Sequence, residues 1–160
     1  MLALDSPRWG ELSHAHGSAE DIPKLLQALA TMDGEEERAE LWYGVWALLC
    51  PEGASVTAAY AAVPHLLSIA EERGAAEQVS SLHVTTTVEM NRHVAGAPAI
   101  PADVVQDYAL AIESLPQRVA ALANEPWNAA VAQVLAATLL VGKRQPQLAR
   151  AVLSLGDETA

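Results

Sequence analysis

The chain has 160 residues, enough for one domain, residues 1–160, with a hydrophobic core of its own. Its 20 acidic and 9 basic residues give a net charge of −11, and the basic residues are scattered, so we expect no nucleic-acid partner. Because Cys50 is the single cysteine and no stretch reaches the ~18 unbroken apolar residues of a membrane span, we expect a cytoplasmic protein without disulfides, cysteine-rich zinc sites or a membrane partner.

The first predicted element is an N-terminal cap over residues 1–17, which leads into a helix. In the stretch WGELSHAHGSAEDIP, Asp21 suits an N-cap, and Pro23 stands in the first turn, where its missing N–H is not needed. Trp9 and Leu12 are expected to cover the apolar end of the first helix pair. We expect no strand in this segment.

The two histidines of this stretch have two interpretations. We expect His14 to be a packed side chain that donates to a nearby backbone carbonyl. Alternatively, His14 and His16 could bind zinc together with Glu11, Glu20 or Asp21. The side chains of a His-x-His pair share a face on a strand, and no strand is expected here, so we predict no metal site and no cofactor.

Four proline-centred segments repeat along the chain: IPKLLQALA, VPHLLSIAE, LPQRVAALA and QPQLARAVL. The first two prolines, Pro23 and Pro64, stand about 40 residues apart, close to the length of a two-helix HEAT repeat. The third copy, at Pro116, comes later because residues 95–101, AGAPAIP, form an inserted loop. The fourth copy, at Pro146, begins a closing half-repeat. We expect helices to continue across Pro64 and Pro116 with a bend.

Each of the first three copies is followed by a second helical pattern, at residues 35–49, 76–90 and 127–141, with apolar side chains at three- and four-residue spacing. Within the second of these, HVTTTV is rich in β-branched residues but has no partner strand nearby, so we expect a helix there too. We therefore predict an all-α fold. It would be a HEAT-like α-solenoid, or right-handed superhelix, of about three helix pairs, with a final helix over 145–155 and a disordered tail over 156–160.

The opening of the chain and its second proline segment resemble a known group of proteins. The pattern W-G-E-L-S-H-A-H-G-S-A-E-D-I-P, followed about one repeat later by A-A-V-P-H-L-L, is similar to bacterial HEAT-like helical-repeat proteins, most of them of unassigned function. The resemblance covers residues 1–70. Relatives of this type carry Tyr in place of His16, and His-Gln-Gly in place of Pro51-Glu52-Gly53. The resemblance implies an α-solenoid fold and a binding role.

An aromatic group in the 35–49 segment is the best candidate for a binding surface. Trp42, Tyr43 and Trp46 lie within about one helical turn, and the second helices of HEAT-like pairs line the concave side of a solenoid. Trp42 and Trp46 could instead pack inward as core, whereas Tyr43 is expected to be exposed. We predict a groove centred near Tyr43. The other residues that we place in this binding site are His14, His16, Glu35 and Tyr60.

These features predict a non-catalytic binding or scaffold module for a protein or peptide, with a basic partner favoured by the acidic charge. One alternative is an immunity-type inhibitor of a basic toxin, and a second is a metal-dependent enzyme that uses His14 and His16. An enzyme is not expected, because Cys50 lies at the C-terminal end of a helix, where a thiolate is disfavoured, and the sequence lacks G-x-S-x-G and phosphate-binding glycine motifs. The sequence leaves the oligomeric state open.

Overall fold

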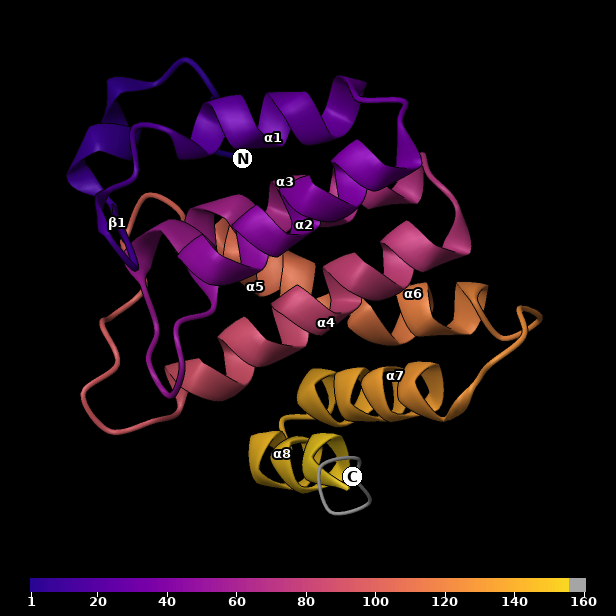
Figure 1. Ribbon diagram of the computed structural model, residues 1–160. Coiled ribbons are helices and arrows are strands. Elements are labelled where there is room, and N and C mark those ends of the chain that lie inside the picture. Colours follow the sequence, from indigo (N-terminus) through magenta and orange to yellow (C-terminus); the bar gives the residue numbers. More distant parts are fainter. Residues whose placement is uncertain (156–160) are drawn as a thin grey trace.

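The computed structural model describes residues 1–155, so the predicted tail, residues 156–160, lies outside the described part. The fold is mostly helical, as the sequence predicts (Figure 1). Among residues 1–155, none of the helices combines the length and apolar character needed to cross a bilayer. The helices are α1 (Ile22–Thr31), α2 (Glu35–Leu49), α3 (Thr57–Glu71), α4 (Ala75–Arg92), α5 (Val105–Glu113), α6 (Leu115–Ala121), α7 (Ala129–Gly142) and α8 (Pro146–Ser154).

The helices pack in two rows. The first helix of each expected pair contacts the next, because α1 packs on α3 and α3 on α5. The second helices do the same, since α2 contacts α4 and α4 contacts α7. The last helix, α8, contacts both α7 and α4, and Figure 1 shows α4, α7 and α8 following one another toward the bottom of the view. One side of the second row is therefore partly covered by α8.

The segment HVTTTV is helical and lies in the middle of α4, which confirms its assignment to a helix. Its β-branched side chains are accommodated because they pack and hydrogen-bond at the interface with α7. Thr85 donates its hydroxyl to the Ser81 carbonyl at 2.8 Å, and Thr86 shares a buried 2.8 Å hydrogen bond with Thr138 of α7. Tertiary contacts thus outweigh the strand preference of this sequence.

The two internal prolines behave differently. Helix α3 continues across Pro64, as predicted. At Pro116 the expected continuous helix is instead two helices, α5 and α6, which meet at Ser114. The Ser114 N–H is shared between the carbonyls of Leu110 and Ala111, which tightens the last turn of α5, and Pro116 then occupies the first turn of α6, where no N–H is required. The prediction of one bent helix was wrong here.

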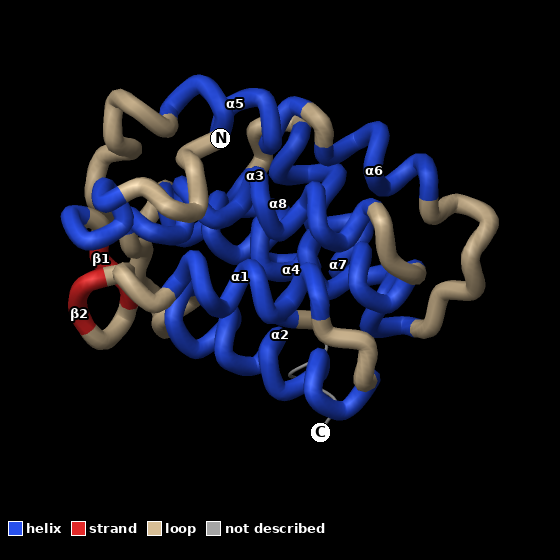
Figure 2. Tube along the Cα trace, turned by 90° about the horizontal axis from the view of Figure 1, so that it is seen from above, coloured by secondary structure: helices blue, strands red, loops and turns tan. Residues whose placement is uncertain are grey.

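The N-terminal segment contains a strand pair where none was expected. A 3-10 helix, Pro7–Glu11, leads into β1 (Ser13–His14), which pairs antiparallel with β2 (Gly17–Ser18). Figure 2 shows the two strands at one end of the molecule. Two long-range hydrogen bonds hold the hairpin: Ser13 N–H donates to the Thr57 hydroxyl at 2.9 Å, and Ala15 N–H donates to the Leu48 carbonyl at 3.0 Å. Partners distant in sequence, and not local propensity, stabilise these strands.

Trp9 and Leu12, the expected cap residues, are both buried. The indole N–H of Trp9 donates to the Ala3 carbonyl at 3.0 Å, which satisfies its one polar group inside the core. Arg8, next to Trp9, pairs with Asp103 at 2.8 Å and so ties the segment to the start of α5. The N-terminal residues thus pack on both the first and the third expected helix pair.

Candidate functional site

The largest cleft that we find lies where α2, α4, α7 and α8 meet, and its volume is about 800 Å³. This volume is within the ~300–1,000 Å³ range of ligand-binding pockets. Its walls come from the C-terminal half of α2, one face of α4, the N-terminal half of α7 and the side of α8 that faces α4. The side chains used in the argument below are Trp46, Cys50, His83, Thr87, Asn91, Gln133 and Arg150.

A row of polar side chains on α4 faces this cleft. His83, Thr87 and Asn91 follow one another at four-residue spacing, so they occupy one face of the helix. None of the three side chains makes a hydrogen bond within residues 1–155, and the same holds for Gln133 on α7. By contrast, the polar side chains on the other faces of α4 are paired: those of Ser80, Ser81, Thr85 and Thr86. The free hydrogen-bonding groups are concentrated at the cleft.

Asn91 is the most enclosed of these residues, because only 4% of its surface is exposed. Within the described chain, no fully buried side-chain oxygen or nitrogen lacks a hydrogen-bond partner. The unpaired amide group of Asn91 must therefore reach solvent, which it meets in the cleft that this residue lines. Burying the donor and acceptor of an amide without hydrogen-bond partners costs free energy. The amide of Asn91 is therefore suited to binding a polar group of a ligand.

Trp46 and His83 form an aromatic pair in the same cleft. Their ring centroids are 4.6 Å apart and the planes are inclined by 49°. Both side chains are partly buried, and burial lowers the pKa of His83 below its ordinary value of 6.5. The imidazole is therefore neutral at pH 7, with one nitrogen able to donate and the other able to accept a hydrogen bond.

Arg150 on α8 is the one basic residue among the cleft-lining side chains. Its guanidinium donates to the Met90 carbonyl at 3.2 Å, which fixes it beside the C-terminal end of α4. Of the seven arginines in the described chain, five pair with carboxylates, whereas Arg144 and Arg150 do not. The paired residues are Arg8, Arg38, Arg73, Arg92 and Arg118.

The single thiol of the chain also lies at this cleft. Cys50 is buried at the C-terminal end of α2, and burial raises its pKa to about 12. Its sulfur contacts the Val84 carbonyl of α4 at 3.9 Å. At neutral pH the residue is almost entirely the thiol, which is a poor nucleophile.

The chain matches no protein-family model, no curated protein and no solved structure.

The cleft between α2, α4, α7 and α8 does not coincide with the groove that the sequence predicts near Tyr43. Tyr43 is 76% exposed, as expected, but Trp46, and not Tyr43, lines the cleft. Glu35 is exposed at the first residue of α2, at the end of the helix opposite Trp46. The cleft is thus displaced from the predicted centre at Tyr43 by about one turn of α2, and a binding role of Tyr43 stays a prediction.

Trp42 has a structural role that the sequence did not indicate. Its indole N–H donates to Glu77 at 2.6 Å, and Arg38 donates to the other oxygen of the same carboxylate at 2.5 Å. Because Glu77 lies in the first turn of α4, this triad joins α2 to α4 through a largely buried ion pair. The polar group of Trp42 is thus used internally.

Tyr60, which was predicted to line the groove, is completely buried. Its hydroxyl donates to the Pro98 carbonyl at 3.1 Å and accepts a hydrogen bond from Ser55 at 2.8 Å. Its ring packs edge-on against Tyr108, with centroids 5.1 Å apart. The assignment to the groove was wrong because α3 is covered on nearly every side and because the loop that follows α4 supplies the hydroxyl with a partner.

His14 and His16 remain near each other, but they have different roles. His14 is half-buried, and its Nδ1 accepts a hydrogen bond from the His16 N–H at 3.0 Å, while Nε2 lies 3.1 Å from the Asp21 carboxylate. The predicted donation to a backbone carbonyl was therefore wrong. Asp21 precedes α1 but uses its side chain on His14 instead of capping the helix. His16 is exposed, and within residues 1–155 we find no group of three ligands suited to a metal, so the absence of a metal site stays a prediction.

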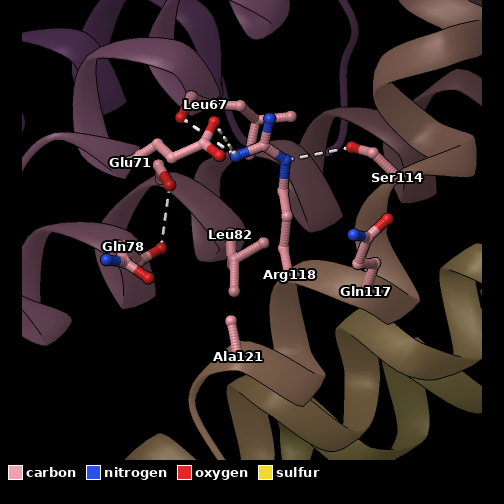
Figure 3. Close-up of a pocket in the computed structure, with 9 residues that line it drawn as sticks. Leu67, Glu71, Gln78, Leu82, Ser114, Gln117, Arg118 and Ala121 are labelled. Atoms are coloured by element: carbon pink, nitrogen blue, oxygen red, sulfur yellow. Dashed lines mark hydrogen bonds and ion pairs between the residues drawn. The ribbon is translucent and has the colours of Figure 1, made fainter.

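A second cavity, of about 200 Å³, lies between α3, α4 and α6 (Figure 3). Arg118 is its one basic residue, and two of the three guanidinium nitrogens donate hydrogen bonds within the protein. It donates to the Leu67 carbonyl and to Glu71, both at 3.2 Å, and to the Ser114 hydroxyl at 3.0 Å. Because Arg118 already has an acidic partner and the cavity is much smaller than the cleft between α2, α4, α7 and α8, it is the weaker candidate.

The sequence analysis missed five of the residues that define the cleft: His83, Thr87, Asn91, Gln133 and Arg150. His83, Thr87 and Asn91 stand four residues apart, but polar residues also occupy many other positions of α4, so the spacing did not single these three out. The sequence did not indicate Arg150 either, whose position depends on a contact between residues sixty apart in the chain.

Proposed function

We propose that the protein is a non-catalytic binding module that holds an extended segment of a protein partner in the cleft between α2, α4, α7 and α8. The observation that carries this proposal is the row of unpaired polar side chains on α4, with Gln133 opposite. A folded domain that leaves such groups unpaired at a concave site gains from a ligand that completes their hydrogen bonds.

The spacing of the row favours a peptide in extended conformation. Side chains four residues apart on a helix are separated by about 6 Å along its axis. Peptide groups that face the same side of an extended chain recur every two residues, at about 6.7 Å. His83, Thr87 and Asn91 are therefore spaced to meet successive backbone groups on one edge of a peptide, as in other modes of recognition through main-chain hydrogen bonds.

Two further features support binding in place of chemistry. The thiol at the cleft, Cys50, is buried and has a raised pKa, so it is unsuited to nucleophilic attack. The pair of Trp46 and His83 provides a partly apolar aromatic surface of the kind that anchors protein partners. The net charge of −11 favours encounter with a partner of basic overall charge.

We further propose that the paired helices are HEAT-like repeats. This proposal is supported by the two rows of contacts, α1 to α3 to α5 and α2 to α4 to α7. In such an arrangement the second helices form the binding side, which agrees with the position of the cleft.

The test is selection of binders from a random twelve-residue peptide library, followed by affinity measurement on a variant in which the cleft is filled. Thr87→Trp should weaken binding of the selected peptides at least about tenfold, whereas Thr31→Trp, at an exposed position on α1, should leave it unchanged. Gln133→Trp fills the cleft from the opposite wall, and it replaces Thr87→Trp in the test if Thr87→Trp lowers the melting temperature of the protein. Selection of no peptide, or equal affinities for all four proteins, would contradict the proposal.

A further inference from the structure

Beyond general peptide binding, the cleft has one end with a distinct chemistry. Arg150 and Asn91 both line the cleft, and the Arg150 guanidinium is bonded to the carbonyl of Met90, the residue that precedes Asn91. Arg150 is an exposed cation without a carboxylate partner in the described chain, and Asn91 is a nearly buried amide without any partner there. The two residues lie on different helices, Arg150 on α8 and Asn91 on α4, far apart in the sequence.

We infer that this end of the cleft binds a carboxylate of the peptide, with Arg150 as the cation and Asn91 as a second hydrogen-bond donor. This inference rests on the proposed function, since it assigns the ligand group for the same cleft. A guanidinium can form two parallel hydrogen bonds to a carboxylate, and charge-assisted bonds of this kind are about twice as strong as neutral ones.

Arg150 is the one arginine or lysine among the cleft-lining side chains, so a carboxylate in the cleft finds its counter-ion at this end. Most exposed charges on the protein are negative, so a carboxylate is repelled by the rest of the surface. Glu52, the one acidic residue among the cleft-lining side chains, belongs to the loop after α2, whereas Arg150 belongs to α8. Glu89, on the same helix as Asn91, is already neutralised by Arg92 at 2.5 Å and receives the Tyr108 hydroxyl at 2.8 Å.

A carboxylate at the C-terminus of the peptide would also give the peptide a direction. Its charged end lies beside α8, and the preceding residues run along α4 toward the pair of Trp46 and His83. The carboxylate can be the C-terminus of the peptide or an Asp or Glu side chain, because both present the same two oxygens. A peptide bound through its C-terminal carboxylate would end at Arg150, so the cleft would not have to extend past that residue.

The experiment uses the full chain and peptides selected from the random library, each resynthesised in three forms. One form is unchanged, one has its C-terminus amidated, and one has Asp and Glu replaced by Asn and Gln. We expect one of the two altered forms to bind at least about tenfold more weakly, and that form identifies the source of the carboxylate.

The protein is varied in parallel, with Arg150→Gln as the test and Arg144→Gln, in the turn before α8, as the matched control. In Arg150→Gln, the unchanged and the altered peptide should bind with equal affinity. In Arg150→Lys, part of the difference in affinity should remain. Arg144→Gln should bind both peptides as the natural chain does. Peptides that bind in the cleft with equal affinity in all three forms would overturn this inference alone. If no peptide is selected at all, the proposed function itself fails. Thermal melting of each variant separates loss of binding from loss of fold.

Discussion

The imidazole of His83 lies 4.6 Å from the indole of Trp46, centroid to centroid, and this contact joins α4 to α2 at the wall of the cleft. Trp46 is the last tryptophan of α2, and His83 starts the row of open polar groups on α4. The pair therefore lies between the core and the site, and changes to either residue should affect both stability and binding.

Acid should destabilise the protein through His83. Because its pKa is lowered in the fold, the unfolded chain takes up a proton more readily, so the free energy of unfolding falls as pH decreases below about 6.5. In His83→Gln, the free energy of unfolding should fall less as the pH decreases, because the contribution of His83 is absent. The measurement is urea unfolding at several pH values between 7 and 5. His16→Gln, at an exposed position, is the control, and identical pH profiles for His83→Gln and the natural chain would show that His83 is not responsible.

Trp46 and Tyr43 should respond oppositely to replacement by alanine. Trp46→Ala removes a half-buried ring from the contact with His83 and should lower the free energy of unfolding by about 2–3 kcal/mol, less than a fully buried tryptophan would. Tyr43→Ala removes a side chain that is 76% exposed and should change stability by less than about 0.5 kcal/mol. Chemical denaturation measures both. Equal losses would place Tyr43 in the core.

Replacement of Glu89 should be among the most damaging single changes in α4. Burial alone would raise the pKa of this carboxyl, but hydrogen bonds from Arg92, Tyr108 and His93 hold it below its ordinary value. Glu89→Ala leaves those donors without their acceptor and should cost about 3–5 kcal/mol in unfolding free energy. Tyr108→Phe removes one of the hydrogen bonds and should cost about 1–2 kcal/mol. If Glu89→Ala lowered the free energy of unfolding by less than Tyr108→Phe does, the Glu89 carboxylate would not be needed for stability.

Gly142 tests the packing of α7 on α6. A Cβ atom at this position would lie 2.9 Å from Cδ and 3.0 Å from Cγ of Pro116, whose ring cannot rotate away. Gly142→Ala should therefore lower the midpoint of thermal unfolding, by an amount that corresponds to about 1–3 kcal/mol. Gly74→Ala, which meets no atom within 4 Å, is the control. An unchanged midpoint in Gly142→Ala would contradict the close approach of the two helices.

Most helices could be predicted from the sequence because their apolar residues recur with helical spacing. The ends of α2, α4 and α8 agree with the expected ranges to within two residues. The sequence could not predict which aromatic side chains of α2 point toward the core. Trp42, Tyr43 and Trp46 lie on adjacent sides of α2, and this helix has no dominant apolar stripe. Only the partner helix decides that Trp42 reaches Glu77 while Trp46 reaches His83.

The errors share one physical origin, which is contact between distant segments. The hairpin of residues 13–18 depends on Thr57 and Leu48, and the burial of Tyr60 depends on the carbonyl of Pro98. The cleft itself exists because α8 packs on α4 and brings Arg150 to Met90. Periodicity describes one helix at a time, so it could not place any of these contacts.

The most direct test of the proposed site is an NMR titration of the isotope-labelled chain with a library-selected peptide. If the peptide lies in the cleft, the side-chain amide signals of Asn91 and Gln133 should shift, because both groups have no partner in the described chain and gain one on binding. The backbone signal of Tyr43, on the exposed side of α2, should stay in place. Shifts centred on Tyr43 and Glu36, with Asn91 and Gln133 unmoved, would contradict the proposed site and return the binding surface to the outer face of α2.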